Sequence, residues 1–224
     1  MIFPLRDLNP SRTVPVVTIG LIAANVVVFA HQTGLGPAAQ GFVMHYAAIP
    51  GRVTGALALP RGAVPPLATL FSHMFLHGSL WHLLGNMWFL WLFGDNVEDA
   101  MGKARFLVFY LLGGLVAALA HVYTEPMSRI PMVGASGAIS AVLGAYVVLY
   151  PAARVLTLFW FFILIRIIDI PAFVYLGVWF LFQVLGAGEG GGIAWYAHIG
   201  GFVAGIVLQV FFVRRGRGAR VAGA

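Results

Sequence analysis

A serine set between small residues, in Gly134-Ala135-Ser136-Gly137, stands where an apolar stretch of the sequence begins. His198 stands at the start of another apolar stretch, in Ala197-His198-Ile199-Gly200-Gly201. A serine hydroxyl is a weak nucleophile at neutral pH, but a neutral imidazole within about 3 Å can take its proton as the new bond forms. The two residues are therefore a candidate nucleophile and general base. In the alternative interpretation, Ser136 bonds back to its own helix and His198 is a buried polar group.

Acyl transfer by such a pair also needs hydrogen-bond donors for the negative charge that develops on the carbonyl oxygen. His82 and Asn86 are four residues apart, so a helix presents both on one face. Backbone N–H groups at the helix start beside Ser136 are further donors. No acidic residue is an obvious third member, because Asp169 is expected near the opposite side of the membrane. These residues predict a Ser–His dyad.

The composition is that of a membrane protein. Hydrophobic residues make up 61% of the 224 residues and charged residues 9%, whereas soluble domains have about 25% charged residues. Several apolar runs reach about 18 residues, which is enough to cross a hydrocarbon core of about 30 Å. The chain has no cysteine, which excludes disulfides, thiolate metal sites and cysteine nucleophiles.

The chain is predicted to be an all-α polytopic membrane protein with a bundle of six transmembrane helices over residues 14–213. Residues 1–13 are expected to form a cytoplasmic polar arm, and residues 214–224 a basic cytoplasmic tail. Residues 32–68 carry five prolines and six glycines, so they are predicted to form a long first loop that lies partly in the membrane.

The later helices are defined by what interrupts them. The fourth begins near Ala135 and is stopped by Pro151, which leaves about 16 residues, or roughly 24 Å. Because this is short for a span, its first turn is expected below the membrane surface. Residues 155–167 are predicted to form a loop near the interface, followed by a fifth helix over 168–185 and a sixth over 193–213.

The net charge of +6 is interpreted as membrane topology rather than nucleic-acid binding, because the basic residues lie at the ends of the apolar segments. With both termini cytoplasmic, all but three of the 13 Lys and Arg residues lie on the cytoplasmic side. The second, fourth and sixth helices then begin at the outer face, which places His82, Ser136 and His198 at one depth. A bacterial or archaeal cell membrane is expected for so compact a chain.

Small residues recur along the two helices that carry the dyad. In the fourth helix Ser136 is followed by Ser140 and Gly144, and in the sixth His198 is followed by Gly201 and Gly205. Such faces let membrane helices approach closely. If the two faces meet, Ser136 and His198 come within hydrogen-bond distance.

The sequence resembles the rhomboid family of intramembrane serine proteases. The resemblance is carried by three ordered motifs, at residues 77–87 (HGSLWHLLGNM), 134–137 (GASG) and 197–201 (AHIGG), and by the six-helix spacing. It implies cleavage of transmembrane segments of other membrane proteins near the outer face, with substrate helices and membrane lipid as partners and with no cofactor or metal. It also implies that residues 186–192 cap the site.

The resemblance further implies roles for individual residues. Ser136 would be the nucleophile, His198 the general base, and His82 and Asn86 the side chains of the oxyanion hole. Some members of the family stack a tyrosine, one turn after the nucleophile, on the catalytic histidine. This chain has Ser140 there, so either another ring or a hydrogen bond is needed to orient His198.

Two alternatives from a different functional class remain. One is a non-catalytic rhomboid-like binder of transmembrane helices. The other is a metal or solute membrane protein that uses His73 and His77 with His82, although no HExxH motif or carboxylate partner accompanies them. The oligomeric state is left open. Glu98 is expected to satisfy the free groups of a helix end, or else to tether a loop.

Overall fold

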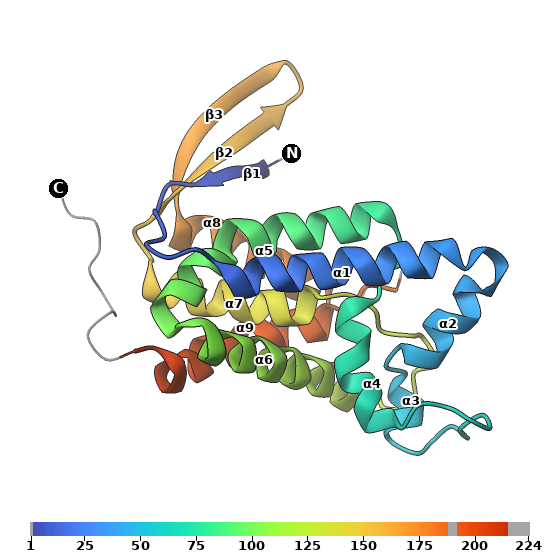
Figure 1. Cartoon of the computed structure of the whole chain (residues 1–224). Coiled ribbons are helices and arrows are strands. Elements are labelled where there is room, and N and C mark those ends of the chain that lie inside the picture. The colour runs from blue at the N-terminus through green and yellow to red at the C-terminus, as the bar shows by residue number, and fades with distance from the viewer. Residues whose placement is uncertain (1, 188–191, 215–224) are drawn as a thin grey trace.

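The computed structural model describes residues 2–187 and 192–214, and most of these residues are helical. Six of the helices in this part of the chain are 14 residues or longer, and they run side by side (Figure 1). They are α1 (Val16–Gly34), α5 (Leu80–Met101), α6 (Lys103–Thr124), α7 (Ser136–Leu149), α8 (Ala172–Gly186) and α9 (Trp195–Phe212).

Three of these helices, α1, α6 and α9, are long and apolar enough to cross a membrane, and α7 and α8 are shorter apolar helices. The 22-residue helix α5 carries Asp95, Glu98 and Asp99 in its last two turns. The prediction of a mostly helical membrane protein is therefore confirmed, while the number of six spans stays a prediction.

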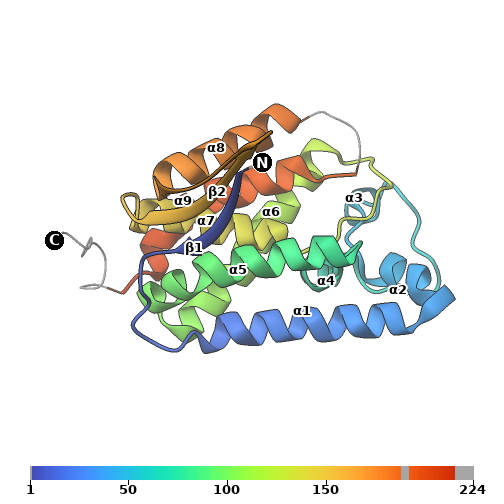
Figure 2. The same ribbon diagram turned by 90° about the horizontal axis from the view of Figure 1, so that it is seen from above.

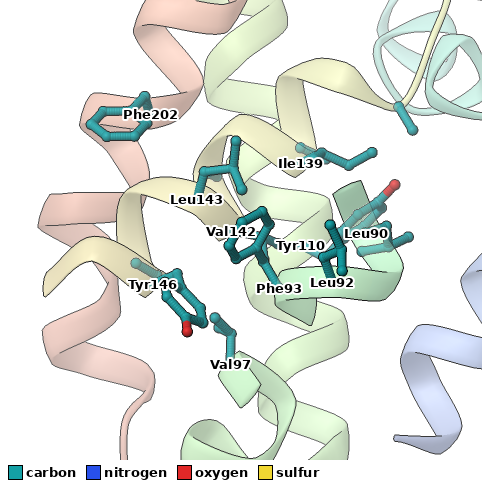
Figure 3. Packing of buried hydrophobic residues seen from close by; sticks show 14 of the residues in the cluster. Leu90, Leu92, Phe93, Val97, Tyr110, Ile139, Val142, Leu143, Tyr146 and Phe202 are labelled. Carbon is teal, nitrogen blue, oxygen red and sulfur yellow. The ribbon is translucent and has the colours of Figure 1, made fainter. Parts of the chain in front are cut away.

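Helix α7 lies inside the bundle, in contact with α5, α6 and α9. It is 14 residues long, or about 21 Å, and eleven of those residues are buried. Figure 3 shows its apolar side chains Ile139, Val142, Leu143 and Tyr146 beside residues of α5 and α6. The ring of Tyr146 meets that of Phe93 edge-on, with centroids 4.9 Å apart. The core of the bundle is built around this short helix.

The contact between α7 and α9 depends on glycine. A methyl group on Gly201 would overlap the carbonyl oxygen of Gly137, and one on Gly205 would overlap that of Ala141. The two backbones therefore touch directly, because no side chain lies between them. The expected meeting of the two small-residue faces is present in the structure.

Between α1 and α5 the chain forms short helices. They are η1 (Gly36–Ala38), α2 (Ala39–Tyr46), α3 (Pro50–Val53), α4 (Pro66–Ser72) and η2 (His73–Phe75). None of these helices is longer than eight residues, and the long first loop that lies partly in the membrane stays a prediction. Its backbone anchors the segment before α7, because Met132 N–H donates to Ala48 O at 2.8 Å and Gly134 N–H to His73 O at 3.0 Å.

A three-stranded antiparallel sheet corrects the prediction of an all-α fold. It consists of β1 (Ile2–Asp7), β2 (Arg154–Phe161) and β3 (Leu164–Pro171), in the order β1-β2-β3. The polar arm predicted for residues 1–13 is thus partly an edge strand. The loop predicted over 155–167 is mostly a β-hairpin, and the fifth helix begins at Ala172 rather than residue 168.

The physical reason is that β-branched and aromatic residues, which fill both strands of the hairpin, fit a pleated sheet. The two strands also pair along their full length, from Arg154 with Pro171 to Phe161 with Leu164. Strand β1 rests on α5, where the ring of Phe3 stacks on Trp88 and the Trp88 indole N–H donates to Pro4 O at 2.8 Å.

At one end of the bundle, Glu98 of α5 is hydrogen-bonded to the start of α1. Its carboxylate accepts the backbone N–H groups of Val17 at 3.0 Å and Thr18 at 2.8 Å, and the Thr18 hydroxyl at 2.9 Å. Since these N–H groups are in the first turn of α1, the expected helix-end role of Glu98 is confirmed. Arg214 N–H donates to Ala100 O nearby, so the chain enters α1 and leaves α9 at the same end.

Besides residue 1 of the predicted arm, two predicted segments fall partly outside the described residues. They are the basic tail over 214–224, of which the structure describes Arg214, and the capping loop over 186–192, of which it describes residues 186, 187 and 192.

Candidate active site

The site lies at the opposite end of the bundle, where α5, α7 and α9 begin (Figure 2). Ser136 is the first residue of α7, and His198 is in the first turn of α9. His198 Nε2 lies 2.8 Å from Ser136 Oγ, and both side chains are partly buried. The glycine contacts between α7 and α9 produce this distance, because bulkier residues would hold the two helix starts apart.

The other ring nitrogen of His198 has a partner that the sequence analysis missed. His198 Nδ1 lies 2.8 Å from Oε1 of Gln183 on α8, and Gln183 Nε2 donates to Trp179 O at 3.1 Å. The rings of Trp179 and Trp195 flank the imidazole, each with its centroid 6.3 Å away. A hydrogen bond and two rings thus surround His198 where some family members use a tyrosine.

Ser140 has a different place from that tyrosine. It is fully buried, and its hydroxyl donates to the backbone oxygen of Ser136 at 2.7 Å. The bond lies within α7, so the Ser140 hydroxyl is not turned toward His198.

His82 and Asn86 lie on the other side of Ser136, in the first two turns of α5. The loop before α7 passes these two side chains at Gly134. The φ of Gly134 is +118°, which strongly favours glycine. A Cβ on Gly134 would lie 2.7 Å from the His82 ring and 3.5 Å from Asn86 Nδ2. The backbone ahead of Ser136 can therefore pass this close to both side chains only because residue 134 is glycine.

A cavity of about 380 Å³ joins most of these groups. Ser136, His198 and His82 line it together with His121 and Glu125 from the end of α6. Asn86 is not among its lining residues. The side chain of Asn86 is buried, and its Nδ2 has no hydrogen-bond partner in the described part of the chain. The structure therefore gathers three of the four predicted residues around one cavity and places the fourth, a donor without an acceptor, close to Gly134.

The histidines considered for a metal site are not joined by carboxylates or by a third ligand. Within residues 2–187 and 192–214, no group of three His, Cys, Asp or Glu side chains is placed to hold an ion. The backbone at His77 is held by Gln32, whose Nε2 donates to His77 O at 2.7 Å. His77 thus has a structural contact through its backbone.

Comparison with known proteins gives the family. The model of the Rhomboid domain matches residues 66–215, about two thirds of the chain. The chain belongs to the rhomboid family. The matched residues include every rhomboid motif on which the resemblance rested.

Individual relatives agree with this assignment. Rhomboid protein 1, mitochondrial, of Saccharomyces cerevisiae is 28% identical over 160 residues, which are 66% of this chain and 43% of the yeast protein. The human presenilin-associated rhomboid-like protein, mitochondrial, is 32% identical over 142 residues, 62% of this chain and 34% of the human one. YdcA of Bacillus subtilis, a proposed rhomboid protease, is 39% identical over 77 residues, 34% of this chain and 38% of YdcA. The matches thus span less than half the length of each rhomboid relative.

The comparisons contradict the predicted bacterial or archaeal cell membrane, because the yeast and human rhomboid relatives are named as mitochondrial proteins of eukaryotes. The expectation rested on the compactness of the chain, and the number and length of its helices describe how a chain crosses a bilayer, not which bilayer it crosses.

Proposed function

We propose that this rhomboid protein is an intramembrane serine endopeptidase that cleaves transmembrane segments of other membrane proteins. The observation that carries the proposal is the 2.8 Å distance between His198 Nε2 and Ser136 Oγ beside a cavity. Membership of the rhomboid family supports it, as does the relation to a proposed rhomboid protease.

In the proposed reaction, Ser136 Oγ attacks the carbonyl carbon of the scissile peptide while His198 Nε2 takes the hydroxyl proton. The tetrahedral intermediate collapses when His198 returns that proton to the leaving nitrogen, so the peptide bond breaks and an acyl-enzyme remains. Water then attacks the ester carbonyl and gives its proton to His198. Collapse of the second intermediate returns the proton to Ser136 Oγ and releases the new carboxyl end.

Three groups are proposed to stabilise the oxyanion of each intermediate. They are the His82 ring, the Asn86 amide and the backbone N–H of Ser136, which has no partner within the first turn of α7. A buried donor without an acceptor costs about 1–3 kcal/mol. Asn86 Nδ2 is such a donor, and a small shift toward an oxyanion would satisfy it. The unpaired amide therefore supports a role that begins when substrate arrives.

The place of the reaction follows from the length of α7. Because α7 spans about 21 Å, less than a hydrocarbon core of about 30 Å, we propose that Ser136 lies below one membrane surface. We also propose six spanning helices over residues 14–213, with the first loop partly in the membrane and lipid around the bundle. The cavity between His82 and Glu125 would supply the water that hydrolysis needs. The names of the yeast and human relatives support a mitochondrial membrane as the location.

The test uses the purified protein in lipid with a reporter transmembrane substrate and a fluorophosphonate probe. Ser136→Ala should abolish cleavage, by a factor of about 10³ or more, and should also abolish labelling. Ser140→Ala is the matched control, because Ser140 lies one turn away on the same helix and its hydroxyl is fully buried. It should leave labelling in place. Cleavage that survives Ser136→Ala would refute the proposal, and a folded protein that is neither labelled nor active would favour the non-catalytic helix binder.

A further inference from the structure

We propose that Gln183 is a positioning residue, whose amide holds His198 in the one neutral tautomer that can accept the Ser136 proton. The inference rests on the proposed protease function and extends it to a residue of α8 whose side chain bonds to His198. It answers how His198 is oriented in a chain that carries Ser140 in place of the family's tyrosine.

The orientation of the Gln183 amide follows from its two hydrogen-bond partners. The two ends of the Gln183 side chain meet different groups, Trp179 O at 3.1 Å and His198 Nδ1 at 2.8 Å. A backbone carbonyl oxygen can only accept a hydrogen bond. The NH₂ group must therefore face Trp179, because the opposite orientation would set two oxygens against each other. This leaves Oε1 facing the imidazole.

The orientation of the amide determines the tautomer of the His198 imidazole. An amide oxygen can only accept, so His198 Nδ1 must carry the hydrogen that lies between them. A neutral imidazole has one N–H, and Nε2 is then left with a free lone pair. That lone pair faces Ser136 Oγ at 2.8 Å, which is the arrangement a general base requires. In the other tautomer an N–H would face the serine oxygen and could not take its proton.

The Ser140 hydroxyl and water are the two groups that could compete for the ring nitrogens of His198. The Ser140 hydroxyl donates to Ser136 O and so leaves His198 to the Ser136 hydroxyl. Gln183 is 7% exposed, and the rings of Trp179 and Trp195 flank the imidazole. Water has little access to the Gln183–His198 contact, so it is a poor substitute for the amide.

An amide suits this place better than a carboxylate. The aspartate of a serine-protease triad orients its histidine and also stabilises the imidazolium. On an apolar helix such as α8, an ionised carboxylate is costly to bury, whereas an amide that makes both of its hydrogen bonds carries no charge. Gln183 thus supplies the orientation without burying a charge.

The experiment compares Gln183→Met, which has a similar length but cannot accept in this way, with Gln183→Glu, which can. Gln209→Met is the matched control, because Gln209 is a buried glutamine on α9 three turns beyond His198. Each variant is assayed in lipid for the rate of fluorophosphonate labelling between pH 6 and 9. The ¹⁵N spectrum of labelled histidine reports which ring nitrogen of His198 carries the hydrogen.

Gln183→Met should slow labelling about 10- to 100-fold and should shift the His198 signals toward the tautomer with hydrogen on Nε2. Gln183→Glu should keep the Nδ1–H tautomer and recover much of the rate. In this variant the acid side of the pH profile should move to higher pH, because a carboxylate favours the imidazolium. Gln209→Met should change neither readout.

The inference is overturned if Gln183→Met leaves both the tautomer and the rate unchanged. If Gln183→Met does not fold, a Gln183→Glu profile identical to that of the parent protein overturns it instead. Failure of the protease proposal looks different, since the unsubstituted protein would then show no labelling at all. The histidine spectrum would still test the role of Gln183 in that case.

Discussion

Helices α7 and α8 both contribute to the site and are almost equally long, but the bundle holds them in opposite ways. Eleven of the 14 residues of α7 are buried, against five of the 15 of α8. Helix α7 touches α9 backbone to backbone, whereas α8 meets α9 through side chains such as Phe180, whose ring stacks on Phe202 at 4.6 Å. The proposed nucleophile is thus on the more deeply buried helix, and the residue proposed to orient the base is on the less buried one.

This difference separates two kinds of mutational effect. A change at the α7–α9 contact should damage the fold and activity together, because the backbones cannot move apart without breaking the core. A change on α8 should alter activity with much less effect on stability. Substitutions at the α7–α9 contact should therefore have larger effects than those on α8.

The largest expected effect comes from Gly205→Val. Any side chain at Gly205 overlaps the carbonyl oxygen of Ala141, and backbone atoms cannot yield as a flexible side chain can. We expect a loss of at least about 3 kcal/mol in the free energy of unfolding and no detectable labelling of Ser136. Thermal unfolding in detergent micelles, followed by circular dichroism, measures the first effect.

The control for Gly205→Val is Gly177→Ala on α8. Gly177 has no heavy atom within 4 Å of a Cβ placed on it, and alanine favours a helix over glycine by about 1 kcal/mol. This variant should be as stable as the parent protein or slightly more stable. If Gly205→Val proves equally harmless, the description of α7 and α9 as a fixed pair is wrong.

A middle-sized effect is expected from Gly186→Ala, at the end of α8. The added methyl group would lie 2.8 Å from the Trp195 ring, which must then shift beside His198. Labelling of Ser136 should slow about 3- to 10-fold, while the unfolding temperature should change by only a few degrees. A fall in stability as large as that of Gly205→Val would show that α8 is held as firmly as α7.

The smallest effect concerns Asp7 in strand β1. Burial raises the pKa of its carboxyl from 3.8 to about 6, and the nearby Asp95 adds to this increase, although Asn9 and Tyr146 oppose it. Because the folded state favours the protonated form, Asp7 contributes stability below pH 4 that is lost as pH rises through about 6. The full difference in pKa would correspond to about 3 kcal/mol in the free energy of unfolding. Partial exposure of Asp7 to solvent reduces this contribution to about 1 kcal/mol.

Asp7→Asn should remove this dependence, so the variant should be about 1 kcal/mol more stable than the parent at pH 8 and closer to it at pH 4. The difference between the two unfolding temperatures, followed from pH 4 to pH 8, measures the effect and cancels the contributions of other groups. A constant difference across this range would show that burial does not raise the pKa of Asp7 in the folded protein.

The contrast between α7 and α8 also separates what the sequence could predict from what it could not. The approach of Ser136 to His198 was predictable, because the small residues that permit it recur at helical spacing on both helices. The contact of Gln183 with His198 was not predictable, since a single amide in an apolar helix matches no motif. Its nearness to His198 also depends on how α8 packs against α9. The only signal was that Gln183 is the one strongly polar side chain of α8.

The sheet was missed for a different reason. A continuous apolar run such as residues 155–171 has no periodicity that distinguishes a strand from a buried helix, and its charged residues suggested a loop. Strand β1 was harder still, because its partner lies far away in the sequence. Six residues with a proline among them do not look like a strand until β2 is present to pair with them.

That long-range pairing has a consequence for the order of synthesis. Strand β1 is made just before α1, yet Ile2 pairs with Phe159, which follows α7. At about 5–20 residues per second, the strand waits on the order of 10–30 s for its partner. Its pairing with β2 therefore forms after α1, α5, α6 and α7 have been made. The sheet is thus completed late, although one of its strands precedes α1 in the chain.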